Sequence, residues 1–487
     1  MFGTFVAELM FAKKKSDMLL GKIRSGEAMT NAEKLNLIYL LSIPSILAQI
    51  TSVMMFFIDQ AMVGSLGAEA PAAIGLVEST IWLFGGLAGA ASMGFSVQTA
   101  HFIGANDLIR AREVVRHSLL CCMAFALIMS ATAAVISPHL PYWLGGGSDI
   151  AGDAATYFLI FAFAIPFMQL NNLASAMLKC EGNMRVSSMM SVTLCVMDMI
   201  LNFLFIFPTR TVTLAGISLT LPGAGLGVAG AALGTAVAYV VCSLVQSWHA
   251  FCRSRLLAIR REAEPFRFIG SYLAAAVKIS VPIALQSVLM GGAQIVSTII
   301  VAPLGNLAIA ANTFAITAES LCYMPGYGIG EAATTLVGQS IGAMRASLCR
   351  SFARMTVCSG MVVMALMGVV MYVSAPELMA LMTPVEAIRQ LGTSCLRIEA
   401  FAEPFFAASI VAYSVCVGAG DTLRPAVMNL CSMWFVRLTL AAALARSYGL
   451  QGVWFAMAVE LTFRGSIFLV HLIRGRWMKA VASGTRD

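Results

Sequence analysis

Two polar residues interrupt an otherwise apolar stretch of the sequence, VMDMILNFLFIF at residues 196–207. They are Asp198 and Asn202, which are four residues apart and would therefore share one face of a helix. A third polar residue, Asp59, lies in the apolar run FFIDQAMVG. Carboxylate and amide oxygens are the ligands that small hard cations prefer, and burial favours the protonated form of a carboxyl group. These residues therefore predict reversible binding of a cation or a proton.

The composition indicates that helices in a membrane position these residues. Of the 487 residues, 59% are hydrophobic and 11% are charged, whereas a soluble protein carries about 25% charged residues. A helix needs about 20 apolar residues to cross the roughly 30 Å hydrocarbon core of a bilayer. Twelve runs of this kind recur, at 37–62, 74–103, 114–138, 153–178, 186–207, 228–252, 275–302, 310–340, 352–374, 388–417, 426–447 and 452–474. We predict an all-α integral membrane protein with twelve transmembrane helices.

The distribution of charge predicts the topology. Lys and Arg gather in alternate loops, around residues 110–116, 179–185, 253–267, 345–354, 424 and 474–479, while the loops between them carry few basic residues. Because cytoplasmic loops are enriched in Lys and Arg, both termini should face the cytoplasm. The net charge of +7 then reflects topology, and we expect the lipid bilayer rather than nucleic acid as a partner. Residues 1–33 lack the apolar core of a signal peptide and are interpreted as a cytoplasmic tail.

An internal repeat divides the chain into two halves. Pro44 in LSIPSILAQ corresponds to Pro282 in ISVPIALQS, an offset of 238 residues. The same offset relates VGSLG to VAPLG, IGA (103–105) to IGA (341–343), Pro138 to Pro376, Pro166 to Pro404 and Gly182 to Gly420. The predicted units are a tail (1–33), an N-terminal six-helix lobe (34–252), a cytoplasmic linker (253–273), a C-terminal six-helix lobe (274–475) and a second tail (476–487). Such pseudo-twofold bundles are typical of secondary transporters with a central cavity.

The extra segment 209–224 of the first half alternates apolar and polar residues and is predicted to form a hairpin on the outer face. It precedes GLGVAG (225–230), which formally matches a dinucleotide-binding pattern. The acidic residue that should follow about 20 positions later is absent, so we interpret GLGVAG as a glycine turn. No GxxxxGK[ST] or HExxH motif occurs. We therefore expect neither ATP hydrolysis, nor a metalloenzyme, nor a bound cofactor.

A charged residue near the middle of a bilayer costs roughly 2.5–3.5 kcal/mol on insertion scales, so such residues are functional candidates. The offset of 238 pairs Asp59 with Ser297 and Asp198 with Val436, so the predicted cation site is one-sided. The second half carries its own polar residues, namely Glu319, Tyr323, Glu331, Glu399, Glu403, Arg437, Glu460 and Arg464. For Glu319, Tyr323, Glu399 and Glu403, a role in substrate or proton binding stands beside a structural one. Glu460 and Arg464 are four apart and are expected to pair, and a helix bend is expected at Pro404.

Five segments carry a resemblance to a known family. They are IDQAMVGSLGAEAPAAIGL, MGFSVQTAHFIGANDLIRAR, VAPLGNLAIAANTFAITAESLCYMPGYGIGEAATTLVGQSIGA, GAGDTLRP and GLQGVWFAMAVELTFR. Over about residues 30–480 the chain resembles the multidrug and toxic compound extrusion (MATE) family. The resemblance implies two six-helix lobes around a cavity in the inner membrane of a prokaryote. It also implies export of drugs and organic cations in exchange for Na⁺ or H⁺, without enzymatic activity, by a chain that we expect to be a monomer.

The resemblance also implies roles for particular residues. Asp59 matches the principal acid of an N-terminal cation site, Thr235 a hydroxyl ligand on the sixth span, and Pro44 a helix-bending proline. Tyr157 and Asn172 match positions that line the same polar network.

Two positions depart from what the resemblance implies. The family pattern on the fifth span places Asn before Asp, whereas here Asp198 precedes Asn202. Positions matching a C-terminal cation site hold Met290 and Phe406, so that version of the site is not supported. The main alternative function is a lipid-linked oligosaccharide flippase of the same wider superfamily.

Overall fold

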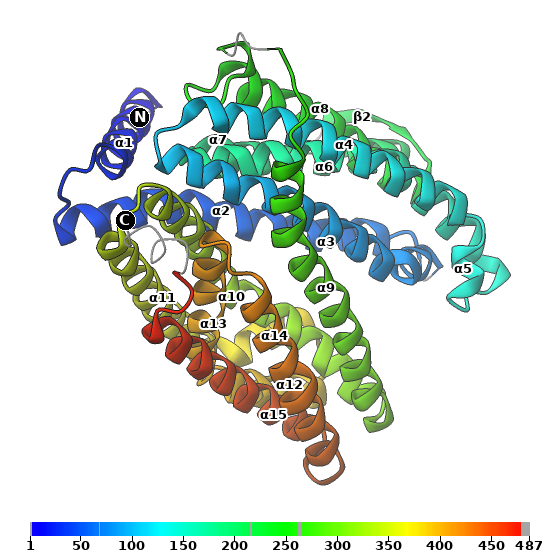
Figure 1. Cartoon of the computed structure of the whole chain (residues 1–487). Coiled ribbons are helices and arrows are strands. Elements are labelled where there is room, and N and C mark those ends of the chain that lie inside the picture. The colour runs from blue at the N-terminus through cyan, green and yellow to red at the C-terminus, as the bar shows by residue number, and fades with distance from the viewer. Residues whose placement is uncertain (1, 68, 215–216, 262–264, 479–487) are drawn as a thin grey trace.

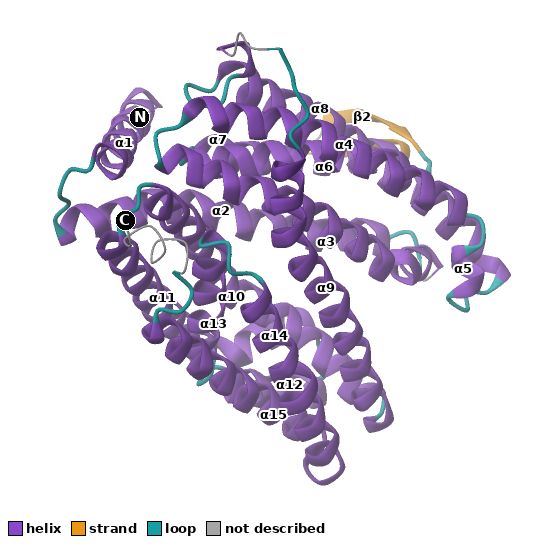
Figure 2. Ribbon diagram, viewed as in Figure 1, coloured by secondary structure: helices purple, strands orange, loops and turns teal. Residues whose placement is uncertain are grey.

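The computed structural model describes residues 2–67, 69–214, 217–261 and 265–478, and almost all of them are helical (Figures 1 and 2). The N-terminal lobe follows α1 (Phe2–Ser25). It comprises α2 (Asn31–Gly64), α3 (Glu69–Gly104), α4 (Leu108–Ile136), α5 (Leu140–Trp143), α6 (Ser148–Glu181), α7 (Met184–Ile206) and α8 (Gly227–Ser247). The predicted hairpin is present as β1 (Pro208–Leu214) paired antiparallel with β2 (Ile217–Ala224).

The C-terminal lobe begins at Gly270. It comprises α9 (Gly270–Val301), α10 (Asn306–Gly342), α11 (Ala346–Met382), α12 (Glu386–Glu399), α13 (Glu403–Gly418), α14 (Leu423–Cys431) and α15 (Leu438–Arg474), with a π-helical turn, Ser432–Arg437, between the last two. GLGVAG forms the glycine turn that was predicted before α8, with positive φ at Gly225 (66°) and Gly227 (55°).

Twelve membrane crossings account for these helices. In the described part of the chain, ten helices are long and apolar enough to span a bilayer, and α12 with α13 forms one more crossing with a 59° bend before Pro404. The segment Leu423–Arg474 is counted among the ten, but its 52 residues would measure about 78 Å as a single helix. Gly449, with φ 58° and ψ −141°, breaks that segment into two crossings. The predicted all-α membrane fold with twelve helices is therefore confirmed.

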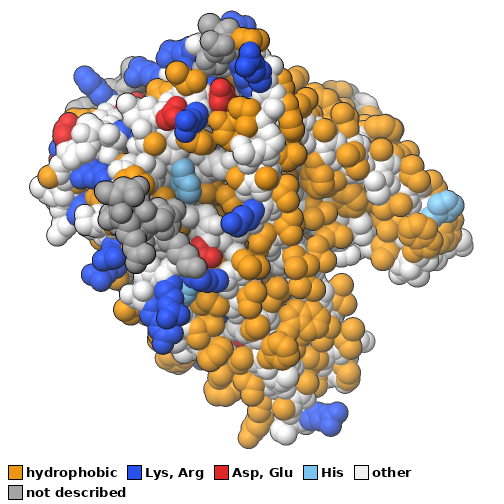
Figure 3. Space-filling view, in the orientation of Figure 1, with side chains coloured by type: hydrophobic (Ala, Val, Ile, Leu, Met, Phe, Trp, Pro, Cys, Tyr) orange, Lys and Arg blue, Asp and Glu red, His pale blue; other side chains and the backbone are white. Residues whose placement is uncertain are grey.

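The two lobes meet at one end of the molecule and diverge toward the other (Figure 1). We call the end that carries α1 and the C-terminal part of α15 the closed end, and the end that carries α5 and the break at Gly449 the open end. Hydrophobic side chains cover the visible outer faces of both lobes, while most visible Lys and Arg side chains lie toward the closed end (Figure 3). The apolar outer faces of the lobes are therefore expected to contact the bilayer, and the basic closed end is expected to contact water.

The repeated IGA motifs mark the crossing of α3 and α10 at the closed end. A Cβ atom on Gly104 would overlap the carbonyl oxygen of Gln339, and one on Gly342 would overlap the carbonyl oxygen of His101. Gly104 and Gly342, like His101 and Gln339, are related by the repeat offset. Because small residues allow helix backbones to approach closely in a membrane, one pseudo-symmetric pair of glycines permits the lobes to touch here.

Helix α1, which the sequence analysis treated as part of a tail, packs on both lobes. Leu19, Leu20 and Ile23 are at most 1% exposed. They belong to a core with residues of the N-terminal lobe and of the C-terminal lobe, namely Leu37, Ile38, Leu41 and Met184, and Ala332, Leu336, Leu348 and Phe352. Arg345 of the C-terminal lobe also donates a hydrogen bond to the carbonyl oxygen of Lys22, at 2.9 Å. Helix α1 therefore bridges the lobes at the closed end.

Ile23→Ala is expected to lower the stability of the protein by about 2–5 kcal/mol, because it leaves a cavity in this shared core. Thermal unfolding in detergent or nanodiscs measures the change. Met18→Ala on the same helix is the control, since Met18 is 56% exposed and its truncation should change stability little. Equal melting temperatures for the two variants would contradict the packing of α1 described above.

Candidate functional site

Two helices bring Asp59, Asp198 and Asn202 together inside the N-terminal lobe. Asp59 comes from α2, and the other two residues come from α7. The amide nitrogen Nδ2 of Asn202 donates to Asp59 Oδ1 at 2.9 Å and to Asp198 Oδ2 at 3.1 Å. Asp198 and Asn202 are 0% and 1% exposed, while Asp59 is partly exposed. One carboxamide thus bridges two carboxyl groups whose residues lie 139 positions apart in the chain.

Glycines of α8 allow this helix to pack closely on α7. A Cβ atom on Gly230 would overlap the carbonyl oxygen of Phe205, and one on Gly234 would overlap Asn202 Oδ1. The next residue, Thr235, consequently lies beside Asp198, with which its hydroxyl group interacts. The sequence GVAGAALGT therefore positions a hydroxyl group at the site because it provides the small residues that precede it.

A cavity of about 650 Å³ opens onto this cluster. Asp59, Asn202 and Thr235 line it, as do Tyr157 and Asn172 of α6. All the residues predicted for the cation site are thus in one region, with Asp198 buried directly behind Asn202. Sequence reasoning missed several other lining residues, namely Phe56, Trp82 and Tyr239. Tyr239 follows Thr235 by four residues, and this spacing on one helix face was the available signal.

The site has free acceptor atoms that suit a cation. Asp198 Oδ1 and Asn202 Oδ1 are buried and have no hydrogen-bond partner among the described residues. A buried oxygen without a partner is costly, and a bound Na⁺ or a proton would satisfy it. Carboxylate, amide and hydroxyl oxygens from three helices form the donor set that a small hard cation prefers. The residues present therefore fit a cation or proton site.

The order of Asp198 and Asn202 has a structural consequence. Asn202, one helical turn closer to the end of α7, donates to both Asp59 and Asp198, and the side chains of Asp59 and Asp198 also interact directly. The two carboxyl groups therefore share one amide group, with Asp59 toward the cavity and Asp198 in the interior. Pro44 lies within α2, fifteen residues before Asp59 and toward the closed end.

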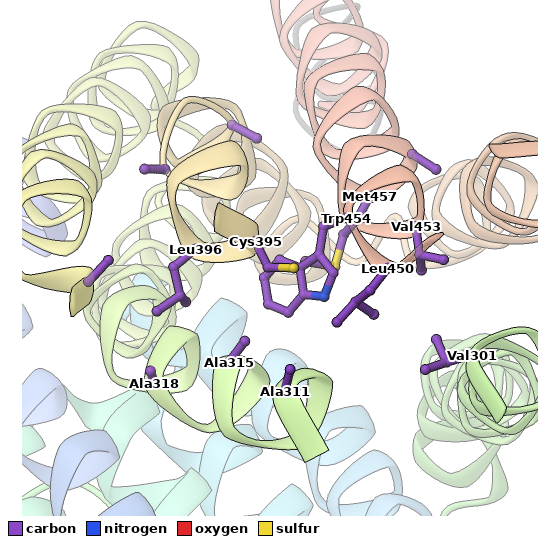
Figure 4. Packing of buried hydrophobic residues seen from close by; sticks show 14 of the residues in the cluster. Val301, Ala311, Ala315, Ala318, Cys395, Leu396, Leu450, Val453, Trp454 and Met457 are labelled. Carbon is purple, nitrogen blue, oxygen red and sulfur yellow. The ribbon is translucent and has the colours of Figure 1, made fainter. Parts of the chain in front are cut away.

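The polar residues of the C-terminal lobe form a separate buried network. Glu319 is 5% exposed, and Glu399 and Glu403, on the two sides of the α12–α13 bend, are both 0% exposed. Tyr323 packs its ring against Phe406, with 5.4 Å between ring centroids. None of these four predicted residues is among the described residues that line the cavity at Asp59. None of them lines the second cavity either, which lies between the lobes and is described below. A core of apolar residues around Trp454 packs beside them (Figure 4).

The predicted pairing of Glu460 with Arg464 is confirmed. Arg464 Nε lies 3.2 Å from Glu460 Oε1, and both side chains are at most 9% exposed. Ser432 donates to the same oxygen of Glu460 at 2.6 Å. Arg437, which is close enough to interact with Glu460, Glu399 and Glu319, joins this network. These contacts explain how several ionisable groups can be accommodated inside one lobe.

Glu460→Gln is expected to destabilise the protein by about 3–5 kcal/mol, because Arg464 would remain buried without its carboxylate. Thermal unfolding measures the loss. Glu386→Gln is the matched control, since Glu386 pairs with Arg389 at 3.4 Å but its side chain is 66% exposed, and exposed pairs contribute little. If Glu460→Gln unfolds at the wild-type temperature, the pair has no stabilising role.

A second cavity, of about 570 Å³, lies between the lobes. Its lining residues come from α2, α3 and α6 of the N-terminal lobe and from α9, α10, α13, α14 and α15 of the C-terminal lobe. Gly85 and Asn172 line both this cavity and the cavity at Asp59. A compound between the lobes and an ion at Asp59 would therefore occupy adjoining spaces.

Comparisons with known proteins agree with this architecture. The model of the MatE family matches residues 44–204 and 282–442, two segments offset by the same 238 residues as the repeat. A probable multidrug resistance protein NorM of Thermotoga maritima is 22% identical over 444 residues, which cover 90% of this chain and 92% of the relative. The corresponding protein of Pseudomonas aeruginosa is 27% identical over 443 residues, covering 85% and 84%. A solved multidrug resistance MATE family transporter in an outward-facing conformation superposes with a TM-score of 0.84 at 20% identity, covering 92% of this chain and 96% of that one.

Proposed function

The chain belongs to the MatE family, and from this membership we propose that it is a secondary active multidrug exporter driven by Na⁺ or H⁺. The observation that carries the proposal is the pair of carboxyl groups of Asp59 and Asp198, bridged by Asn202, at the end of an intramembrane cavity. Such groups are costly in a bilayer, and where they occur they mark ion or proton pathways. The names of the relatives, probable multidrug resistance proteins, support cationic and amphiphilic small molecules as substrates.

The proposed location is the inner membrane of a prokaryote, with both termini in the cytoplasm. The Lys and Arg side chains near the closed end support this orientation, because basic residues are retained on the cytoplasmic side. The closed end then seals the cytoplasmic side, and the cavity between the lobes faces outward. The proposed unit is a monomer whose coupling ion is Na⁺ or H⁺ and which needs no organic cofactor.

The proposed mechanism is alternating access, and the two adjoining cavities support it. In the outward-open state, a cation or proton reaches Asp59 from outside and neutralises the carboxyl pair, which favours release of the exported compound. Rearrangement of the lobes then opens the site to the cytoplasm, where the ion leaves and a new compound enters. Each ligand can drive its step only by binding the two states with different affinity. Asn172, which lines both cavities, is placed to respond to both ligands.

Flux into proteoliposomes tests the proposal and identifies the ion. The purified chain is reconstituted, and movement of tetraphenylphosphonium or ethidium is followed under an imposed Na⁺ gradient without a pH difference, and then under a pH gradient without Na⁺. We expect one gradient to drive the compound in the opposite direction to the ion. If neither gradient moves any of the compounds, while lipid-linked oligosaccharides are translocated, the flippase function replaces this proposal.

A further inference from the structure

One carboxylate of the C-terminal lobe holds two groups of the N-terminal lobe. Lys179 Nζ, near the end of α6, lies 2.5 Å from Glu331 Oε1 of α10. Gln49 Nε2 of α2 donates to the same oxygen at 3.0 Å. The sequence analysis assigned Lys179 to the basic residues that set topology, but the structure places its charge in a contact between the lobes.

The same segment of α6 contacts α10 through its backbone. Thr335 donates from its hydroxyl group to the carbonyl oxygen of Lys179 at 2.9 Å, and Gln339 donates from Nε2 to the carbonyl oxygen of Cys180 at 2.8 Å. All these contacts lie toward the closed end, near the crossing of α3 and α10. The pair of Lys179 and Glu331 is therefore part of the contact that holds the closed end together.

This ion pair also lines the cavity between the lobes. The side chains of Lys179 and Glu331 are 25% and 22% exposed. Among the described residues that line the cavity, Glu331 is the sole carboxylate, and Arg464, the other cation, already has Glu460 as its partner. Glu331 Oε2 is buried and has no hydrogen-bond partner in the described chain. A cation that enters this cavity therefore meets one carboxylate, which is held through Oε1 by Lys179 and Gln49 and whose second oxygen is reached only when the Glu331 side chain moves.

We propose that Glu331 is the counter-ion for the cationic group of the transported compound, and that the compound binds by displacing Lys179 and thereby releases a contact between the lobes. This inference rests on the proposed export of cationic compounds and names the residue that recognises them. Exchange of one cation for another keeps the Glu331 carboxylate paired, so it avoids leaving that partly buried charge without a partner. A compound that replaces Lys179 binds the separated lobes more tightly than the closed pair, and this difference in affinity shifts the population of the two states.

Binding measurements on the full chain distinguish a role of Glu331 and Lys179 in substrate recognition from a purely structural role. Tetraphenylphosphonium binding is measured by calorimetry for the wild type, Glu331→Gln and Lys179→Met. Glu331→Gln should weaken binding by roughly tenfold, because the counter-ion is lost. Lys179→Met should tighten it several-fold, because the competing cation is gone. Glu69→Gln and Lys278→Met, which remove exposed charges outside both cavities, should bind as the wild type does.

A conformational readout tests the release of the lobes. Spin labels on the closed end of each lobe should move apart when tetraphenylphosphonium is added to the wild type, but not when it is added to Glu331→Gln. The double variant Lys179→Glu with Glu331→Lys restores opposite charges and should keep the closed end together. It serves as a control in case a single variant misfolds. A neutral compound of similar size should bind all variants equally.

The outcomes distinguish this inference from the proposed function. If Lys179→Met weakens binding as much as Glu331→Gln does, or if neither variant changes it, the pair is only structural and the inference is wrong, while ion-driven export still stands. If the wild type neither binds nor transports tetraphenylphosphonium or ethidium, both the inference and the proposed substrate class are overturned.

Discussion

Asp59→Asn should abolish ion-driven export while leaving the protein folded. The substitution keeps the size of the side chain and a hydrogen-bonding oxygen for Asn202, but it removes the carboxylate that faces the cavity. A coupling free energy of about 1–3 kcal/mol corresponds to a factor of roughly 5 to 150. We expect the rate of export under either gradient to fall by a factor of this size or more. Proteoliposome flux measures the loss, and unchanged binding of tetraphenylphosphonium verifies that the substrate cavity is intact.

Two further variants place this result in context. Glu69→Gln removes an exposed acid from the first turn of α3, outside both cavities, and should transport normally. Asp198→Asn should also impair coupling, because Asp198 shares the amide group of Asn202 with Asp59. If the two acids act as one unit, the double variant Asp59→Asn with Asp198→Asn should be no worse than either single variant. Ion-driven export that survives in Asp198→Asn would make that residue a packing element.

Gly104→Ala should prevent the closed end from forming. The added methyl group would meet the carbonyl oxygen of Gln339 in the backbone of α10, which cannot move aside as a side chain would. Overpacking of this kind costs roughly 1–3 kcal/mol, enough to change the ratio between two states by about 5- to 150-fold. We expect export to fall accordingly, and a cysteine introduced near His101 to become reactive toward a thiol reagent from the cytoplasmic side.

Controls for this variant come from the same helix and from the repeat. Gly75→Ala lies on α3 with no atom within 4 Å of the new Cβ, so it should export normally. Gly342→Ala, the counterpart of Gly104 in the second half, should reproduce the defect, because its Cβ would meet the carbonyl oxygen of His101. Normal export by both Gly104→Ala and Gly342→Ala would show that the lobes tolerate a wider separation at the closed end.

Much of the architecture followed from features that are local in the chain. Apolar runs long enough to cross a bilayer identified the twelve helices, and Pro404 and the spacing of Glu460 and Arg464 correctly predicted a bend and an ion pair. The offset of 238 residues identified the two halves before any helix was placed. These predictions succeeded because hydropathy, helix periodicity and duplication depend on neighbouring residues or on comparison of segments.

The sequence by itself determined which residues are polar inside the membrane, and its resemblance to a known family grouped Asp59, Asp198, Asn202 and Thr235 as one site. It left the roles of Glu319, Tyr323, Glu399 and Glu403 open between substrate binding and structure, and it gave no sign that α1 joins the two lobes or that Lys179 pairs with Glu331. Only the tertiary structure revealed the bridging position of α1 and the pairing of Lys179 with Glu331, because these depend on how helices far apart in the chain cross and rotate.

The stretch VMDMILNFLFIF illustrates the difference between what the sequence determined and what the tertiary structure decided. Its spacing placed Asp198 and Asn202 on one helix face, but the same spacing fits either residue as the neighbour of Asp59. The crossing of α2 and α7, together with the close approach of α8 at Gly234, placed both side chains beside Asp59, with Asn202 donating to it and Asp198 fully buried. Hydropathy and helix periodicity depend on the residue types along the chain, whereas the contact between two side chains 143 residues apart depends on the packing of whole helices.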